Sequence, residues 1–130
     1  MKDVFCRIID KEIPSTVIYE DDDVIAILDI SQVTKGHTLV MPKKHYDNFL
    51  EMPDDEYASL MKKAKKVANK VIDATKANGC NVLINTNAVA GQTIMHTHVH
   101  IIPRYDDSDT IDIGFSENEY DLNEVLNQIL

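Results

Sequence analysis

One run of nine residues, His-Thr-His-Val-His-Ile-Ile-Pro-Arg at 96–104, restricts the fold of this 130-residue chain more than any other. Side chains of a β-strand alternate between its two faces, so the run predicts a strand whose histidines share one face. Those histidines are His96, His98 and His100. On the opposite face Val99 and Ile101 would contact a hydrophobic core, which leaves three imidazoles facing a ligand. Three of the five histidines of the chain fall here, so chance explains the pattern poorly.

Four other segments have the composition of strands. Thr16–Tyr19 and Val24–Leu28 flank a run of four acidic residues and predict a hairpin with a polar turn. A third strand is expected from His37 to Met41, and Pro42 ends it because proline has no amide hydrogen for a central ladder. A fourth is expected over residues 81–86, and the loop after it returns the chain to the histidine strand.

Between these strands, residues 54–77 predict one long amphipathic helix. Apolar side chains recur there at steps of three and four residues, which is the period of one buried helical face. Acidic residues at positions 54–56 suit the positive end of the helix dipole, and Asn78-Gly79 follows the expected end. The lysines lie mostly off the apolar stripe and are expected to face solvent. Strands and helix together predict an α+β domain built on an antiparallel sheet.

The net charge of −9 is concentrated near the C-terminus. Residues 1–104 contain all 13 Lys and Arg and 14 acids, whereas residues 105–130 contain eight acids and no base. A chain without an excess of basic residues does not suit duplex nucleic acid, although a small nucleotide needs only a few local donors. We interpret the acidic stretch as solvated. Its last part, 121–130, predicts a short amphipathic helix whose apolar side carries Leu122, Val125, Leu126 and Ile129.

The length suits a single domain over residues 1–130, with a core at about 3–104 and an acidic extension at 105–130. Charged residues interrupt the first fifteen positions, and no apolar run approaches the length of a membrane span. We therefore expect a cytoplasmic protein. Cys6 and Cys80 have no paired spacing, so they are expected to be free thiols.

The row of imidazoles allows three interpretations. Polar side chains on the wet face of an edge strand are the simplest. A zinc site is the second, because His-x-His on a strand can present two nitrogens, although a straight row of ligands converges poorly on one ion. Nucleophilic catalysis is the third and the one that we favour, because a neutral imidazole can attack phosphorus and leave again. Gln92, Thr93 and Asn85 lie nearby as phosphate donors.

These motifs resemble the histidine triad (HIT) family, whose signature is His-φ-His-φ-His-φ-φ with φ apolar. Thr97 is a polar departure at the first φ. The likeness extends over residues 3–104 and is closest to the bacterial Hit branch, which ends in Ile-Ile-Pro-Arg. The segments that carry it are Phe5-x-x-Ile8-Ile9-x-Lys11-Glu12-Ile13-Pro14, Leu28-Asp29-Ile30, Lys35-Gly36-His37-Thr38-Leu39-Val40, Pro42-Lys43-Lys44-His45 and Ala90-Gly91-Gln92.

The resemblance implies a five-stranded antiparallel sheet with one long and one short helix, to which the C-terminal helical segment is added. It also implies a homodimer. In the site it implies that His98 is the nucleophile, that His100 donates to a phosphate oxygen, and that His96 pairs with His37 to orient the site. The implied nucleotide ligands are Asn85, Gln92 and Thr93 for the phosphate and leaving group, Asp29 for the ribose, and Phe5, Ile8, Ile27 and Ile30 for the base. From the residues alone, Asp29 could equally form a turn and the four apolar side chains could be plain core.

Some bacterial relatives begin with Cys-x-x-Cys and hold structural zinc with those thiols and two histidines. Here the matching positions are Asp3, Cys6, His45 and His96. This set could still bind zinc, but the loss of one soft thiolate argues against a tight site. We therefore expect no required cofactor and interpret His45 as a polar residue that starts a short helix.

The expected activity is hydrolysis or transfer of nucleoside 5′-phosphoramidates or related nucleoside phosphate conjugates, with a purine base, through a nucleotidyl-histidine intermediate. The alternatives are a dinucleoside polyphosphate hydrolase, a nucleotide-binding module without turnover, and a zinc protein.

Overall fold

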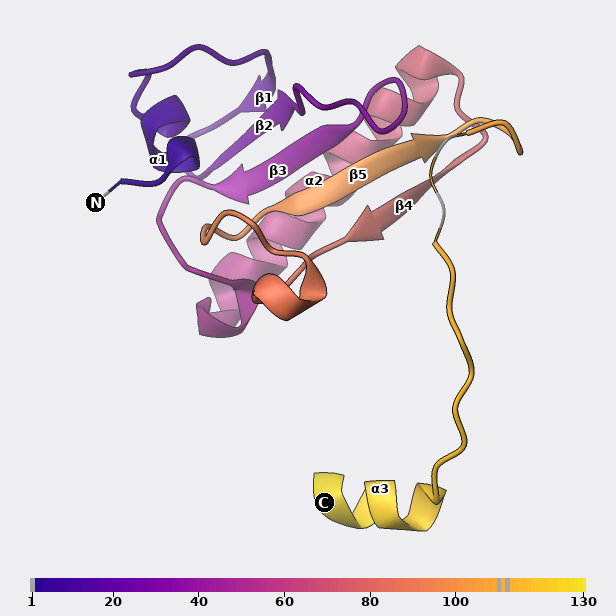
Figure 1. The fold of residues 1–130 in the computed structure, drawn as a ribbon. Coiled ribbons are helices and arrows are strands. Elements are labelled where there is room, and N and C mark those ends of the chain that lie inside the picture. The colour runs from indigo at the N-terminus through magenta and orange to yellow at the C-terminus, as the bar shows by residue number, and fades with distance from the viewer. Residues whose placement is uncertain (1, 110, 112) are drawn as a thin grey trace.

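A computed structural model describes residues 2–109, 111 and 113–130; of the acids in the C-terminal stretch, Asp112 lies outside this part. Five strands form one antiparallel sheet in the order β1-β2-β3-β5-β4 (Figure 1). They are β1 (Val17–Glu20), β2 (Val24–Leu28), β3 (Thr38–Pro42), β4 (Gly79–Leu83) and β5 (Val99–Arg104). The expected α+β fold with a five-stranded antiparallel sheet is confirmed.

Two helices cover opposite faces of the sheet. Helix α2 (Asp54–Thr75) packs its apolar stripe on one face, where Val99 and Ile101 lie fully buried as the alternation predicted. Helix α1 (Val4–Ile9) packs on the other face, where Phe5 and Ile8 contact residues of β2 and β3. His100 pairs with Leu39 of this second face, so the sheet separates the α2 core from the histidines.

The hairpin between β1 and β2 is closed by Asp21. Its Oδ1 accepts hydrogen bonds from the amides of Asp23 and Val24, each at 2.8 Å. Its Oδ2 accepts from the Tyr19 hydroxyl at 2.6 Å and lies 2.9 Å from Nζ of Lys63 on α2. Burial alone would raise the pKa of Asp21, but the bonds from Tyr19 and Lys63 hold it well below the usual value. The polar turn therefore also ties the edge of the sheet to the long helix.

The helices differ in detail from the expectation. Helix α2 ends at Thr75, two residues before the expected end at 77, because Lys76 adopts a left-handed conformation (φ 63°). The Lys76 amide donates to the Ile72 carbonyl and closes the last turn. No helix begins at His45; residues 49–51 form only a single 3₁₀ turn. The short helix of the fold is α1, where Asp3 acts as N-cap and its Oδ1 accepts from the Cys6 amide at 2.8 Å.

The strand that carries the histidines is shorter than the alternation predicted. β5 begins at Val99, so His96 and His98 precede it. Its pairing with β3 extends from Thr38↔Ile101 to Val40↔Val99 only. Before Val99 the chain bonds to a loop instead, since the Thr97 amide donates to the Tyr46 carbonyl at 2.8 Å. His37 likewise lies one residue before β3.

β4 is also displaced from its expected range, residues 81–86. It covers Gly79–Leu83, and its last pair is Leu83↔His100, close to where the partner strand β5 begins. With no partner beyond this point the chain leaves the sheet, and Asn85 lies in the loop that follows.

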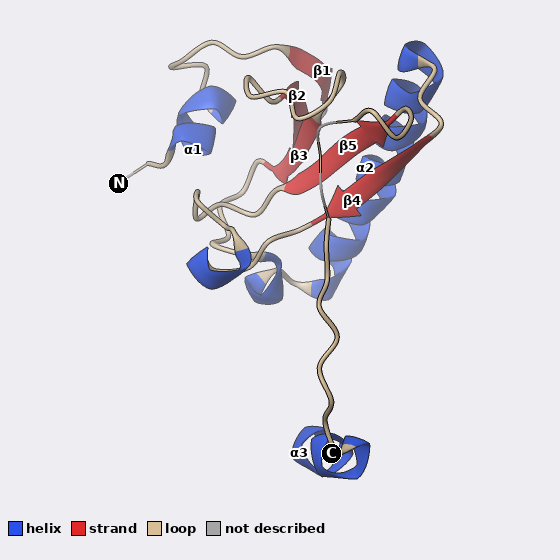
Figure 2. Cartoon of the chain, turned by 45° about the vertical axis from the view of Figure 1, so that its right-hand side comes forward, coloured by secondary structure: helices blue, strands red, loops and turns tan. Residues whose placement is uncertain are grey.

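The C-terminal segment ends in α3 (Leu122–Ile129), which confirms the helix expected there. Asp121 is its N-cap and accepts from the Asn123 amide at 3.0 Å. Figure 2 shows α3 well apart from the sheet, at the end of an extended chain. Within the described residues, no helix has both the length and the apolar composition needed to cross a membrane.

Candidate active site

A cavity of about 560 Å³ lies on the α1 face of the sheet. Residues from α1, β2, the turn after β2, the loop after β4 and the histidine segment line it. Its floor is apolar, and polar side chains from the turn, the loop and the histidines lie among the lining residues. The volume is in the range of small-molecule sites, and a few polar groups among apolar walls are what such sites use for orientation.

His98 lines this cavity and is 7% exposed. Its Nδ1 lies 2.7 Å from the carbonyl oxygen of His96. Because a carbonyl oxygen can only accept, Nδ1 carries the proton and Nε2 holds the lone pair. The ring of Phe5 packs edge-on at 5.0 Å between centroids. Burial lowers the pKa of His98 below 6.5, so this imidazole is neutral at pH 7 and keeps its lone pair.

His100 also lines the cavity, and a second histidine holds its orientation. Nε2 of His37 lies 3.0 Å from Nδ1 of His100. Nδ1 of His37 lies 3.3 Å from both the Val33 amide, which donates to it, and the Ser31 carbonyl oxygen. The Asp29 carboxylate, 3.7 Å from Nε2 of His37, favours a proton on Nε2, where it points to His100. His100 therefore accepts at Nδ1 and carries its own proton on Nε2. Burial, together with the neighbouring His98 and His37, lowers the pKa of His100 to about 4, against a weaker opposing effect of the Asp29 carboxylate.

The expected pairing of His37 with His96 is wrong. His37 contacts His100, and His96 lies in a separate cluster. The reason is the local backbone: His37 directly precedes β3, and the β3 residue that pairs with His100 is Leu39. His96 comes before β5 and is carried away from this end of the sheet.

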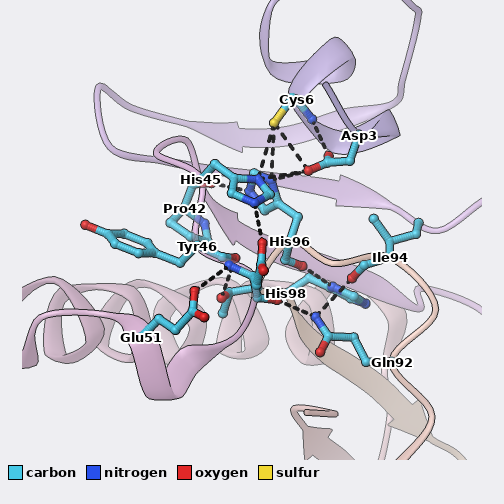
Figure 3. Close-up of polar contacts among 12 residues, drawn as sticks. Asp3, Cys6, Pro42, His45, Tyr46, Glu51, Gln92, Ile94, His96 and His98 are labelled. Carbon is cyan, nitrogen blue, oxygen red and sulfur yellow. Dashed lines mark hydrogen bonds and ion pairs between the residues drawn. The ribbon is translucent and has the colours of Figure 1, made fainter. Parts of the chain in front are cut away.

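His96 is fully buried in a cluster with Asp3, Cys6 and His45 (Figure 3). The possible ligand atoms of these four residues all lie within 4.8 Å of one another. Nδ1 of His96 lies 3.3 Å from Oδ2 of Asp3, and Nδ1 of His45 lies 2.9 Å from the same oxygen. Burial and the Asp3 carboxylate raise the pKa of the Cys6 thiol. The polar atoms of these four side chains are thus in close contact with one another.

The orientation of this cluster suits a zinc ion. Nε2 of His96 donates to the Pro42 carbonyl at 2.8 Å, and Nε2 of His45 lies 2.7 Å from Asp47. Bonds of this kind orient metal-binding histidines and leave the opposite nitrogen for the metal. One carboxylate, one thiol and two imidazoles form an acceptable zinc set, with one thiolate rather than two. None of these four residues lines the cavity.

The expected nucleotide ligands fall into two groups. Asn85, Thr93, Asp29 and the four apolar residues line the cavity as expected. Within this group Phe5, Ile8 and Ile27 are buried, whereas Ile30 is 100% exposed and can only form the rim. Asp29 forms the turn that was its alternative interpretation, since its Oδ1 accepts from the Ser31 amide at 2.8 Å, and its Oδ2 lies 3.7 Å from Nε2 of His37.

Gln92, which was expected as a phosphate ligand, does not line the cavity, and its side chain is bonded to neighbouring loops. Its side chain is 1% exposed, and its amide nitrogen donates to the carbonyls of Asp47 and Ile94. Its oxygen accepts from the Asn87 amide at 2.8 Å. Every polar atom of this side chain therefore joins the two loops beside the site, and Gln92 shapes the loop that presents Thr93.

Sequence reasoning missed four backbone groups that contact ring nitrogens of the histidines. These are the carbonyls of His96, Ser31 and Pro42 and the amide of Val33. Backbone groups leave no signal in residue type, so none of the four could have been read from the sequence.

Known proteins with similar sequences and folds identify the family that shares these features. Residues 10–107 match the HIT domain family. The chain belongs to the HIT family. Among curated HIT proteins, it is 49% identical over 127 residues to an uncharacterised HIT-like protein of Methanocaldococcus jannaschii, covering 97% of each chain. It is 44% identical over 101 residues to the adenylylsulfatase HINT3 of Arabidopsis thaliana, covering 78% of this chain and 51% of that protein.

Solved HIT structures agree with the fold. A HIT protein from Bacillus subtilis superposes with a TM-score of 0.93 at 40% identity, over 99% of this chain and 95% of that one. A histidine triad nucleotide-binding protein from Candida albicans gives 0.85 at 30% identity, over 98% and 92%. A zinc-bound HIT protein from Mycobacterium smegmatis gives 0.78 at 35% identity, over 83% and 78%. The resemblance to the HIT family and its Hit-like branch is thereby confirmed.

Proposed function

We propose that this HIT protein hydrolyses nucleoside 5′-phosphoramidates or related nucleoside phosphate conjugates through a nucleotide covalently held on His98. The observation that carries the proposal is the hydrogen bond from Nδ1 of His98 to the His96 carbonyl at 2.7 Å. That bond leaves the Nε2 lone pair of a buried, neutral imidazole as the nucleophile of the cavity.

The reaction proceeds in two displacements. Nε2 of His98 attacks the phosphorus, a new N–P bond forms, and the bond from phosphorus to the leaving group breaks. The leaving group departs with that electron pair and takes up a proton from water. A second water then attacks the phosphorus and gives its proton to the hydroxide left from the first water, the N–P bond breaks with its electron pair returning to Nε2, and the nucleoside monophosphate leaves with His98 restored. The Nε2–H of His100 donates to a non-bridging oxygen, on which negative charge increases in each transition state.

The lining of the cavity suits a nucleotide. Thr93, Asn85 and Asp29 line the cavity, and we propose Thr93 and Asn85 as ligands of the phosphate and leaving group and Asp29 as the acceptor for the ribose hydroxyls. Phe5, Ile8 and Ile27 offer a flat apolar wall to the base, which we propose is a purine. The names of two relatives support this class of ligand, because one is an adenylylsulfatase and another a nucleotide-binding protein.

We propose one HIT domain with an acidic extension, a homodimer as the working unit, and a cytoplasmic location consistent with two free cysteines. Nucleic acid is not a proposed partner. We also propose that zinc is not required for turnover, because the zinc-like cluster lies outside the cavity.

The test is steady-state turnover by protein dialysed against a chelator, with adenosine and guanosine 5′-phosphoramidates and diadenosine polyphosphates as substrates. His98→Ala should lower phosphoramidate turnover by at least about a thousandfold while nucleotide binding persists, because only the nucleophile is removed. A base-quenched sample of the active enzyme should show an added nucleotide in its intact mass. Cys80→Ser, outside the cavity, is the control. Near-normal turnover by His98→Ala would remove the covalent mechanism.

A further inference from the structure

The zinc-like cluster of Asp3, Cys6, His45 and His96 joins three segments of the chain: the start of α1, the loop after β3 and the segment before β5 (Figure 3). Sγ of Cys6 lies 3.6 Å from Nδ1 of each histidine and 3.3 Å from Oδ2 of Asp3. That oxygen lies 3.3 Å from Nδ1 of His96 and 2.9 Å from Nδ1 of His45. The ligand atoms of a tetrahedral zinc ion are about 3.3 to 3.6 Å apart at its usual bond lengths. The cluster therefore has nearly the dimensions of a zinc site.

Asp3 distinguishes this cluster from one with two thiolates. A carboxylate oxygen is a harder ligand than a thiolate and holds the borderline-soft zinc ion less strongly. The same side chain also caps α1, because its Oδ1 accepts from the Cys6 amide at 2.8 Å while its Oδ2 faces the histidines. An ion at this cluster would therefore bind reversibly and would hold the first turn of α1 at both Asp3 and Cys6.

Phe5 transmits the position of α1 to the cavity. It lies between Asp3 and Cys6 in the sequence, is 5% exposed and lines the cavity. Its ring packs edge-on against the rings of His96 and His98, with centroids 6.0 and 5.0 Å apart. Helix α1 has only six residues, and a helix this short is held by its packing rather than by its own hydrogen bonds. A contact that fixes the first turn of α1 thus also fixes the wall proposed for the base.

The nucleophile is held by a different part of the structure. His96 is fully buried, and its Nε2 donates to the Pro42 carbonyl at 2.8 Å. Its backbone carbonyl, which accepts from Nδ1 of His98, is therefore fixed by bonds within the protein. An ion at the cluster is thus expected to act on α1 and the base wall rather than on His98.

We propose that zinc bound by Asp3, Cys6, His45 and His96 fixes α1 and thereby tightens the binding of a nucleotide base against Phe5. Coupling between two sites is reciprocal, so a bound nucleotide tightens the binding of zinc by the same factor. The effect is on affinity, and turnover at saturating substrate is unchanged. The inference rests on the proposed nucleotide cavity and is independent of the covalent intermediate.

Calorimetric titration of chelator-treated protein with AMP, with and without one equivalent of zinc, tests the coupling. Zinc is expected to lower the Kd for AMP by about five- to fiftyfold, within the usual range for coupled sites. Adenosine, which lacks the phosphate that binds zinc in solution, should show the same ratio. Competition with a chromophoric chelator should show the Kd for zinc falling by the same factor at saturating AMP.

Two failures are distinguishable in these titrations. Equal affinity for AMP with and without zinc would overturn the inference and leave the proposed function intact. Absence of AMP binding in either state would overturn both, because the cavity would then not be a nucleotide site.

Cobalt in place of zinc locates the ion. A thiolate ligand gives cobalt a charge-transfer band in the near ultraviolet, whereas an ion held by Asp29, His37 and His100 would lack it. The band is expected in the unmodified protein and should disappear in Cys6→Ser. A cobalt complex of the unmodified protein without this band would place the ion elsewhere and overturn the inference.

His45→Gln and Asp3→Cys form a variant pair for the ligands. His45 is 44% exposed and lies outside the cavity, so His45→Gln removes a ligand without disturbing the core. AMP should bind this variant equally with and without zinc, as it binds the metal-free protein. Asp3→Cys supplies a second thiolate and should bind zinc at least about tenfold more tightly. No gain in zinc affinity would contradict the role given to Asp3.

Hydrogen exchange of the α1 amides reports on the link itself. It should slow on addition of zinc in the unmodified protein and stay unchanged in His45→Gln. Tighter AMP binding without slower exchange in α1 would mean that this helix does not connect the two sites.

Discussion

Two adjacent imidazoles in the cavity carry their protons on different nitrogens. Neutral His98 has its hydrogen on Nδ1, where it donates to the His96 carbonyl. His100 accepts at Nδ1 from His37 and has its hydrogen on Nε2. One ring thus offers a lone pair and the other a proton. A nucleophile and an electrostatic stabiliser are the two groups that a displacement at phosphorus needs.

The pH dependence of turnover follows from the protonation of His98. Its pKa is lowered by burial, so the ring keeps its free lone pair to a lower pH than a solvent-exposed imidazole does. We therefore expect the acid limb of kcat/KM to have its midpoint below pH 6.5, the usual pKa of a histidine. Rates across pH 4.5–8.5 with a substrate that does not ionise in this range give the measurement. An acid limb above pH 7 would contradict the burial argument.

His37 is expected to be a positioning residue. His37→Phe keeps a flat ring but removes the donor to His100, so the tautomer of His100 is no longer held. Loss of one hydrogen bond of about 1 to 1.5 kcal/mol predicts a fall in kcat of about tenfold with little change in KM. The ¹⁵N shifts of His100 should move toward a mixture of tautomers, a change that a merely structural role would not produce. Unchanged shifts with reduced kcat would contradict the role.

Residue types predicted the site better than they predicted its contacts. Proximity to the triad pointed to Asn85 and Thr93, whereas Asp29 and the apolar wall of the cavity came from the resemblance to the HIT family. The partner of His37 and the structural role of Gln92 were missed, because each depends on which loops meet in space. Two amide hydrogens and one oxygen of Gln92 could satisfy a phosphate or a loop equally well, and only the fold decides.

At the scale of elements, helix α1 connects the cavity to the zinc-like cluster. Phe5 and Ile8 wall the cavity, whereas Asp3 and Cys6 of the same turn contact His96 and His45. The two carboxylate oxygens of Asp3 have different partners: Oδ1 caps the helix and Oδ2 faces the histidines. The position of the proposed base-binding wall therefore depends on a contact network on the other side of α1.

Substitutions at Asp3 should separate its two roles. Asp3→Asn retains a capping oxygen but loses the charge, and Asp3→Ala loses both. The alanine variant should lose about 1 kcal/mol of unfolding free energy more than the asparagine variant, the usual contribution of an N-cap. Urea unfolding at pH 7.5 without added metal measures the difference. Equal losses in the two variants would mean that the cap contributes nothing.

Local sequence pattern predicted the helices better than the strand boundaries, because strand boundaries depend on pairing with another strand. Periodicity predicted α2, the hairpin and the C-terminal helix, since each depends on residues close in sequence. The ends of β4 and β5 were misplaced by two or three residues. Their limits follow from pairing across the sheet, where Leu83 meets His100 and the chain before Val99 bonds to a loop. Such long-range pairings have no signature within a strand.

For the whole molecule, stability should change with pH in two separate windows. His98 and His100 are held neutral, so their unfolded forms bind protons first as the pH falls. Their effect is absent above pH 6.5 and destabilises the fold progressively down to about pH 4. Asp3 and Asp21 have lowered pKa values, so the stability that they contribute above their unfolded pKa of 3.8 is lost below it. Urea midpoints from pH 7.5 to 3 test this order.

His100→Gln supplies the matched variant for the upper window. It removes one of the two histidines while keeping a polar side chain of similar length, so the decline between pH 6.5 and 4 should become shallower. The decline below pH 3.8 should be unchanged, because the aspartates remain. An identical slope in both proteins would assign the upper window to other groups.

The hydrogen bonds from the Val33 amide to His37 and from His37 to His100 also bear on inhibitor design. They leave the Nε2–H of His100 as a donor in the cavity, which attracts anions, while the free lone pair of His98 attracts electrophilic centres. Oxyanions such as vanadate, which accept hydrogen bonds and add a fifth ligand readily, match both demands at once. Screening collections for this cavity should favour such heads on flat aromatic bodies over basic amines.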